Sequence, residues 1–121
     1  MVNKVDYNQL GITKPNKLQI EKTEHVNISI NTGVLGEKIW MGQFTAEPGA
    51  TSLPQHHEQS DVVLYILKGK VTLFYGENYS TTEELYEGDF IYVPPYQPYI
   101  FKNPSETESL EIITTMAPYF R

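Results

Sequence analysis

The stretches GATSLPQHHEQSDVVLYILKG (49–69) and GDFIYVPPYQPYIFKN (88–103) decide the fold. Each contains an apolar run bounded by glycine or proline, which is typical of strands that end in turns. Every residue of Val62–Leu67 is apolar, which indicates a strand covered on both faces. Pro94 and Pro95 have no N–H to donate to a ladder, so the strand before them must end there. The two stretches therefore predict two strand pairs whose polar residues meet at one opening.

The rest of the chain also consists of short strand-like segments separated by turn residues. Apolar and polar residues alternate in Val26–Ile30, Val71–Tyr75 and Leu110–Ile112, and turn residues interrupt the alternation at regular intervals. Short strands at this spacing predict an all-β sandwich or barrel. Only residues 6–11 and 81–85 could hold a helical turn.

Composition limits the class of protein. The chain has 121 residues, 40% of them hydrophobic, which is enough for one core. With 15 acidic and 9 basic side chains it would repel nucleic acid and anionic membranes, so we predict neither as a partner. The absence of cysteine excludes disulfides and thiolate chemistry. The chain has no apolar run of signal-peptide or bilayer-spanning length, so we predict a cytoplasmic protein. Residues 1–22 are predicted to be an N-terminal arm, and residues 23–121 a single barrel domain.

The two stretches resemble the two halves of the cupin signature, G-x5-H-x-H-x3/4-E-x6-G and G-x5-P-x-G-x2-H-x3-N. The frame EPGA, YILKGKV and EGDFIYVPP carries the resemblance, which covers residues 33 to 115 and is strongest to small, single-domain RmlC-like cupins. It implies a jelly-roll β-barrel, also called a double-stranded β-helix. In that family three histidines and a glutamate hold one metal ion inside the barrel.

The resemblance also implies a position for each metal ligand. Gln55 and His57 fall on the first two histidine positions, Val62 falls on the glutamate with Asp61 beside it, and Tyr99 falls on the last histidine. Amide oxygen and protonated phenol gain less from a divalent cation than imidazole does. We therefore expect a divalent metal ion to be held only weakly, by His57, Gln55, Asp61 and Tyr99, and we expect no organic cofactor. If the loop register slips by one residue, His56 becomes the first ligand and Glu58 the second.

The same residues support two classes of function. We predict first a small-molecule-binding cupin whose cavity is lined by Gln55, His57, Asp61, Val62, Tyr99 and Phe101. The alternative is a cupin-type isomerase, lyase or oxygenase acting on a sugar derivative or a small aromatic acid. In that enzyme the imidazole of His57, the carboxylate of Asp61 and the phenol of Tyr99 form an acid–base set.

The pattern also predicts packing and assembly. In Val62–Leu67 alternation directs Val62, Leu64 and Ile66 to the interior. The opposite face of this strand needs a cover that no helix of the chain supplies, so we predict a homodimer. Tyr65, Tyr75 and Tyr92 are expected to fill the core.

Overall fold

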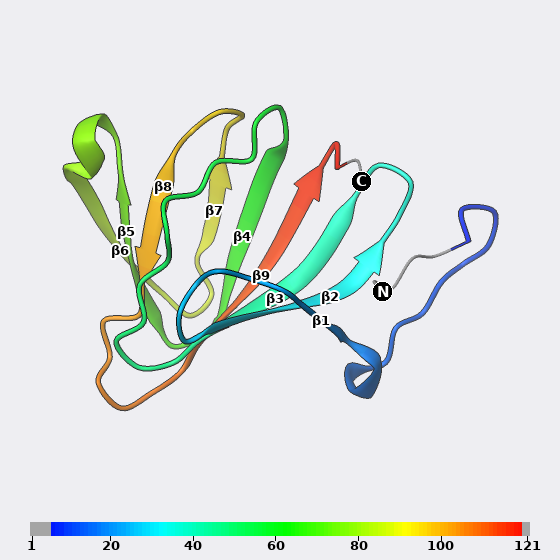
Figure 1. The fold of residues 1–121 in the computed structure, drawn as a ribbon, viewed down its shortest axis with the longest axis horizontal. Coiled ribbons are helices and arrows are strands. Elements are labelled where there is room, and N and C mark those ends of the chain that lie inside the picture. The colour runs from blue at the N-terminus through cyan, green and yellow to red at the C-terminus, as the bar shows by residue number, and fades with distance from the viewer. Residues whose placement is uncertain (1–5, 120–121) are drawn as a thin grey trace.

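Residues 6–119, the part of the chain that the computed structural model describes, form nine strands and two short 3₁₀ helices (Figure 1). The strands are β1 (Gln19–Glu21), β2 (Ile28–Leu35), β3 (Trp40–Ala46), β4 (Asp61–Lys68), β5 (Lys70–Tyr75), β6 (Thr81–Tyr86), β7 (Phe90–Val93), β8 (Tyr99–Lys102) and β9 (Leu110–Ala117). The helices are Pro15–Lys17 and Glu77–Tyr79. Neither helix has the length or the apolar composition that crossing a membrane requires, and these residues contain no other.

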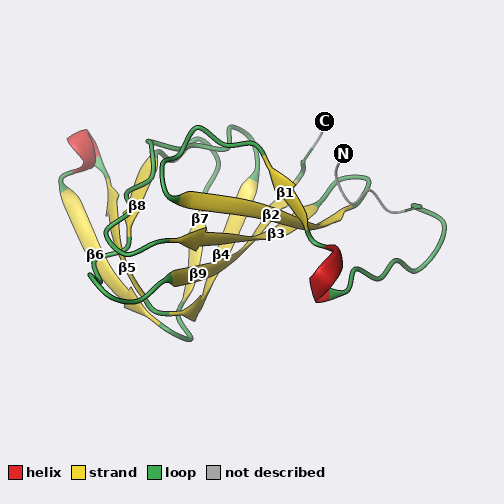
Figure 2. Ribbon diagram, turned by 60° about the horizontal axis from the view of Figure 1, so that its bottom comes forward, coloured by secondary structure: helices red, strands yellow, loops and turns green. Residues whose placement is uncertain are grey.

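The strands form two antiparallel sheets (Figure 2). The larger sheet has the order β1-β2-β3-β9-β4-β7, and the smaller sheet has the order β6-β5-β8. Single bridges join Thr51 to Lys102 and Gln55 to Tyr99, so the loop after β3 runs beside β8 as an irregular extra strand. This crossing of strands between two sheets is that of a jelly roll, and the predicted all-β fold is confirmed.

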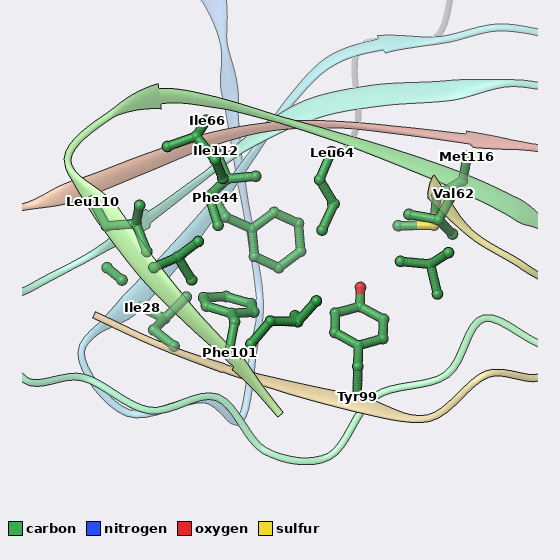
Figure 3. Packing of buried hydrophobic residues seen from close by; sticks show 14 of the residues in the cluster. Ile28, Phe44, Val62, Leu64, Ile66, Tyr99, Phe101, Leu110, Ile112 and Met116 are labelled. Atoms are coloured by element: carbon green, nitrogen blue, oxygen red, sulfur yellow. The ribbon is translucent and has the colours of Figure 1, made fainter. Parts of the chain in front are cut away.

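The core lies between the two sheets and is built from alternate residues of their strands (Figure 3). On β4, Val62, Leu64 and Ile66 are buried as predicted. Val63 and Leu67, which point the other way, are 42% and 46% exposed. Within the described residues, β4 is therefore fully covered on its inner face only.

One segment differs from its predicted structure. Residues 81–85 do not form a helical turn, because they pair with β5 along the whole of β6. Their pattern has no apolar alternation, and the strand is fixed by this pairing and by a 2.9 Å hydrogen bond from Thr72 Oγ1 to Glu84 Oε1. Residues 19–21, near the end of the predicted arm, pair with β2 as β1.

Two of the three tyrosines expected in the core lie outside it. Tyr75 packs against the core as predicted. Tyr65 and Tyr92 point to the outer face of the larger sheet, where Tyr65 stacks on Phe90 with ring centroids 4.7 Å apart and Tyr92 is 60% exposed. The inner positions next to them on β4 and β7 are taken by aliphatic side chains, so the expectation for these two was wrong.

Gly42 makes room for the Trp40 side chain on β3. A Cβ atom at Gly42 would collide with the indole ring of Trp40 and with the carbonyl oxygen of Asn31 on β2. Without that atom the buried indole lies over its own strand. Trp40 can therefore form part of a pocket wall, as described below.

Candidate functional site

A hydrogen bond joins His57 to Tyr99 inside the barrel. Nε2 of His57 lies 3.0 Å from Oη of Tyr99, and the ring centroids are 5.9 Å apart. Tyr99 stands on β8 and projects between the two sheets with its hydroxyl at the tip (Figure 3). It is only 3% exposed, whereas His57, on the loop between β3 and β4, is half-buried. The structure thus brings together two residues that the sequence proposed for one site.

The loop that carries His57 is tied to β8 through the backbone. Gln55 and Tyr99 exchange two backbone hydrogen bonds of 2.9 Å each. The N–H of Ser52 donates to the carbonyl oxygen of Phe101 at 2.8 Å, and the N–H of Phe101 donates to Oγ of Ser52 at 3.0 Å. These bonds hold the side chains of Gln55, His57 and Tyr99 in fixed relative positions.

Burial sets the protonation state of this pair. It raises the pKa of the Tyr99 phenol above its usual value, so the hydroxyl keeps its proton at neutral pH. Burial first, and the nearby His56 second, lower the pKa of His57 from its usual 6.5, so the imidazole is neutral. The phenol and the imidazole are both neutral, and one hydrogen bond joins Oη of Tyr99 to Nε2 of His57. The pair is therefore uncharged.

Gln55 places an unpaired donor next to this pair. Burial lowers the pKa of His25, so its ring carries one proton, and Nδ1 accepts the N–H of Leu53 at 2.9 Å. The proton of His25 is therefore on Nε2, and the hydrogen bond between His25 and the Gln55 side chain must use the carbonyl oxygen of Gln55. Nε2 of Gln55 is left buried without a partner among the described residues. An unsatisfied buried donor costs about 1–3 kcal/mol, so an acceptor from outside the chain would be stabilising here.

A pocket of about 250 Å³ lies beside Gln55 and His57. The side chains that line it, which combine an aromatic and apolar wall with a few polar groups, are Glu21, Lys22, Ile30, Trp40, Phe44, Gln55, His57, Met116 and Tyr119. An adjoining hollow of about 360 Å³ shares His57, Met116 and Tyr119 with it and also contacts His56. Apolar walls with a few fixed polar groups are typical of sites that bind small molecules.

A chain of hydrogen bonds orients the carboxylate in this pocket. Nε1 of Trp40 donates to Oγ1 of Thr32 at 2.9 Å, and that hydroxyl donates to Oε2 of Glu21 at 2.6 Å. Thr32 is fully buried, so the three groups satisfy one another away from water. Glu21 is therefore a fixed acceptor on β1 that faces the aromatic wall.

The other predicted site residues lie elsewhere. Asp61 is on the outer face of β4, where Tyr92 Oη donates to its Oδ1 at 2.6 Å. The prediction that Asp61 lies beside His57 was wrong. Successive side chains on a strand point to opposite faces, so Val62, the next residue, takes the inner position. Val62 and Phe101 are core residues that do not line the 250 Å³ pocket, and Phe101 packs edge-on against Phe44 at 5.9 Å.

The donor atoms do not fit the metal ion that the resemblance implies. Within residues 6–119 no three His, Asp or Glu side chains are grouped so that they could hold an ion. Nε2 of His57 is hydrogen-bonded to Oη of Tyr99, the carbonyl of Gln55 faces His25, and Asp61 points outwards. No chemical step at this site is therefore assigned to a metal.

Of the nine residues that line the pocket, the sequence singled out only Gln55 and His57 as site residues. Trp40, Glu21 and Tyr119 come from β3, β1 and the segment after β9, which are far apart along the chain. Their common position depends on long-range strand pairing, including that of Trp40 with Met116. The one local signal was Trp40, an aromatic residue at the start of a strand with alternating burial. An ordinary core position has the same pattern, so this signal does not identify a pocket residue.

Comparison with known proteins agrees with this fold. A family model described as the cupin domain matches residues 42–116. No curated protein matches the chain. Among solved structures, an RmlC-like cupin from Shewanella frigidimarina is 15% identical with a TM-score of 0.76, and the match covers 92% of this chain and 93% of that one.

Two further structures show how varied the relatives of this fold are. The polyketide cyclase RemF from Streptomyces resistomycificus is 14% identical with a TM-score of 0.78, and the match covers 92% of this chain and 81% of that one. The Cnp3 cupin domain of Schizosaccharomyces pombe is 18% identical with a TM-score of 0.69, and the match covers 81% of this chain and 66% of that one. At these identities the likeness extends to the fold alone. Because the cupin model spans more than half of its length, the chain belongs to the cupin family.

Proposed function

We propose that this cupin binds a small organic molecule in the 250 Å³ pocket beside Gln55 and His57. The observation that carries the proposal is the buried amide nitrogen of Gln55, which has no partner among the described residues. Its orientation is held by the hydrogen bond to His25 and by the backbone bridge to Tyr99. A fixed donor of this kind favours a molecule that brings an acceptor oxygen.

The other walls narrow the chemistry of the molecule. Trp40, Phe44 and Tyr119 offer apolar and aromatic surface for a planar or ring-shaped body. Glu21 adds a carboxylate acceptor and Lys22 adds a cation, so the formal charges on the pocket wall balance. We therefore expect an uncharged molecule with an oxygen acceptor for Gln55 and a donor for Glu21.

The experiment is a ligand-observed NMR screen with matched probes of one size. Benzamide offers a carbonyl acceptor and an N–H donor, benzoate replaces the donor with a charge, and toluene has neither. We expect benzamide to bind, and benzoate and toluene to bind more weakly. His57→Ala and Gln55→Leu should weaken benzamide binding, whereas Tyr92→Phe, which removes a phenol on the outer face, should not. Equal binding by all four proteins would place the molecule elsewhere.

An enzymatic role remains the second candidate, and the His57–Tyr99 pair favours it. A neutral imidazole in contact with a protonated phenol can act as a general base in a proton transfer. In an isomerase, lyase or oxygenase at this site, Asp61 cannot supply the carboxylate of the acid–base set, because its side chain lies on the outer face. Turnover that disappears in both Tyr99→Phe and His57→Ala, while ligand binding persists, would favour the enzyme.

We also propose that two copies associate through the outer face of the larger sheet. Met41 on β3 and Val63 and Leu67 on β4 form a partly exposed apolar strip there. The N-terminal arm exposes Leu10 and Ile12, which a second copy could cover. Apolar side chains of this kind are stabilised when a partner removes them from water.

A further inference from the structure

A second hollow, of about 340 Å³, follows the edge of the larger sheet. All four residues of β7, Phe90, Ile91, Tyr92 and Val93, line it. Because successive side chains of a strand point to opposite faces, a hollow that touches all four lies along the edge of the strand. β7 ends the order of the larger sheet and pairs with β4 alone. The hollow shares no lining residue with the 250 Å³ pocket.

The register shows which backbone groups of β7 face this hollow. The N–H of Ile66 donates to the carbonyl oxygen of Asp89 at 3.0 Å, so this opposed pair is a hydrogen-bonded one. Bonded and non-bonded pairs alternate in an antiparallel ladder, which makes Ile91 and Val93 the residues bonded to β4. Phe90 and Tyr92 therefore direct their N–H and C=O groups away from β4, towards the open edge.

The 340 Å³ hollow is a groove between the edge of β7 and the smaller sheet, which forms its far wall. Leu73 and Tyr75 of β5 and Leu85 of β6 supply apolar surface. Glu83 of β6 lies among them, because it is opposite Leu73 in the register and shares its face. The groove thus pairs unused backbone groups on one side with an apolar wall and one carboxylate on the other.

The β7 edge carries few of the features that prevent strand addition. Edge strands are normally blunted by lysine, by proline or by inward-pointing charges. β7 is only four residues long and is followed by Pro94, but it contains no lysine, proline or charged residue, and Phe90 and Tyr92 are 74% and 60% exposed. The single charge in the groove is Glu83 on the opposite wall. A strand entering here must therefore bring a positive charge to that carboxylate.

We propose that the edge of β7 binds an extended peptide of another protein as an added strand, with apolar and basic side chains in turn facing the groove. Main-chain hydrogen bonds to Phe90 and Tyr92 and alternating side-chain pockets are the features of strand-addition sites. A second copy of this chain fits less well. Its own edge, Phe90–Val93, has no cation for Glu83, and each copy carries a net charge of −6. Tyr99 also lines this hollow, and its hydrogen bond to His57 connects the hollow to the proposed ligand pocket.

The test uses a capped octapeptide in which threonine alternates with valine and lysine, so that one face of the strand carries valine and lysine in turn. Binding is measured by fluorescence anisotropy and by NMR of the backbone amides. We expect the Phe90 and Tyr92 amide signals to shift. Glu83→Gln should weaken binding about threefold, as loss of an exposed ion pair does. A scrambled peptide of the same composition, and one N-methylated on alternate residues, should not bind measurably.

Tyr92→Pro removes one edge N–H without touching the β4 ladder, and it should abolish binding. Tyr79→Phe, which removes a phenol that does not line the groove, should bind like the parent. If Tyr92→Pro does not fold, the amide shifts and the N-methylated peptide decide the question in the unmodified protein. Equal binding of the scrambled peptide would overturn the proposal. The proposal would also be overturned if the parent protein were a dimer and Tyr92→Pro were a monomer, because a second copy would then occupy the edge of β7.

Discussion

The hydroxyl of Tyr99 lies 3.0 Å from Nε2 of His57, between the two sheets of the barrel. Both residues fall on positions where the cupin pattern has histidine ligands. Here a hydrogen bond joins the two side chains, and burial keeps both uncharged. A neutral hydrogen-bonded pair suits the recognition of an organic molecule better than the coordination of a cation.

Tyr99→Phe tests the contribution of this hydrogen bond. The change removes one hydroxyl and little volume, so the free energy of unfolding should fall by about 0.5–1.5 kcal/mol. Ligand binding should weaken, because the His57 ring is no longer held. Urea denaturation and NMR titration measure the two effects. Tyr75→Phe, at a partly buried position on β5, is the control. Unchanged ligand binding in Tyr99→Phe would show that the His57–Tyr99 hydrogen bond does not contribute to the site.

Stability should depend on pH through His57. Its pKa in the folded protein is lowered below 6.5, so the unfolded chain binds more protons as the pH falls through that value. The contribution of His57 to the free energy of unfolding is therefore completely present above pH 6.5, and it is lost as the pH falls below that value. Burial lowers the pKa of His25 as well and adds to the same trend. Urea melts between about pH 5.5 and 7.5 should show a smaller slope for His57→Gln than for the parent. An equal slope would mean that the imidazole is not buried as described.

Asp61→Asn should leave the pocket intact. Asp61 holds Tyr92 on the outer face, and this hydrogen bond raises the pKa of the Tyr92 phenol. Replacing the carboxylate should return that pKa towards its usual 10, as ultraviolet titration would show. Binding of pocket ligands should not change. A loss of binding would restore Asp61 to the site.

The metal content of the purified protein should be low. His57 is the only imidazole of the original frame, and its Nε2 is held in a hydrogen bond with Oη of Tyr99. Any divalent ion should therefore be lost on dialysis against a chelator, as elemental analysis can show. Stoichiometric zinc, iron, nickel or copper that survives this treatment would contradict the account of the site.

Leu67→Glu should separate the two copies of the proposed homodimer. It places a charge on the strip that also includes Met41 and Val63, where it would be costly to cover. Sedimentation should give a dimer for the parent and 13.9 kDa for the variant. Thr51→Glu, an exposed position opposite Lys102 of β8 in the smaller sheet, serves as the control. A monomeric parent would refute the dimer.

The sequence predicted those parts of the fold that depend on alternation. Val62, Leu64 and Ile66 are buried, and Tyr99 and Phe101 point inwards, because period two determines the face of each residue once a strand is placed. Asp61 was misplaced because nearness along the chain was taken for nearness in space.

The walls of the pocket and the strand β6 could not be predicted in this way. Glu21, Trp40 and Tyr119 meet through the pairing of distant strands, for which a single sequence has no local signal. Residues 81–85 lack an apolar alternation and form a strand because β5 supplies a partner.

The most direct test of the central claim is a crystal structure of the protein with a bound small molecule identified by the NMR screen. The account predicts the molecule in the 250 Å³ pocket, with an oxygen atom within hydrogen-bond distance of Nε2 of Gln55 and its body against Trp40. A molecule bound on the outer sheet, with only water at Gln55, would contradict it.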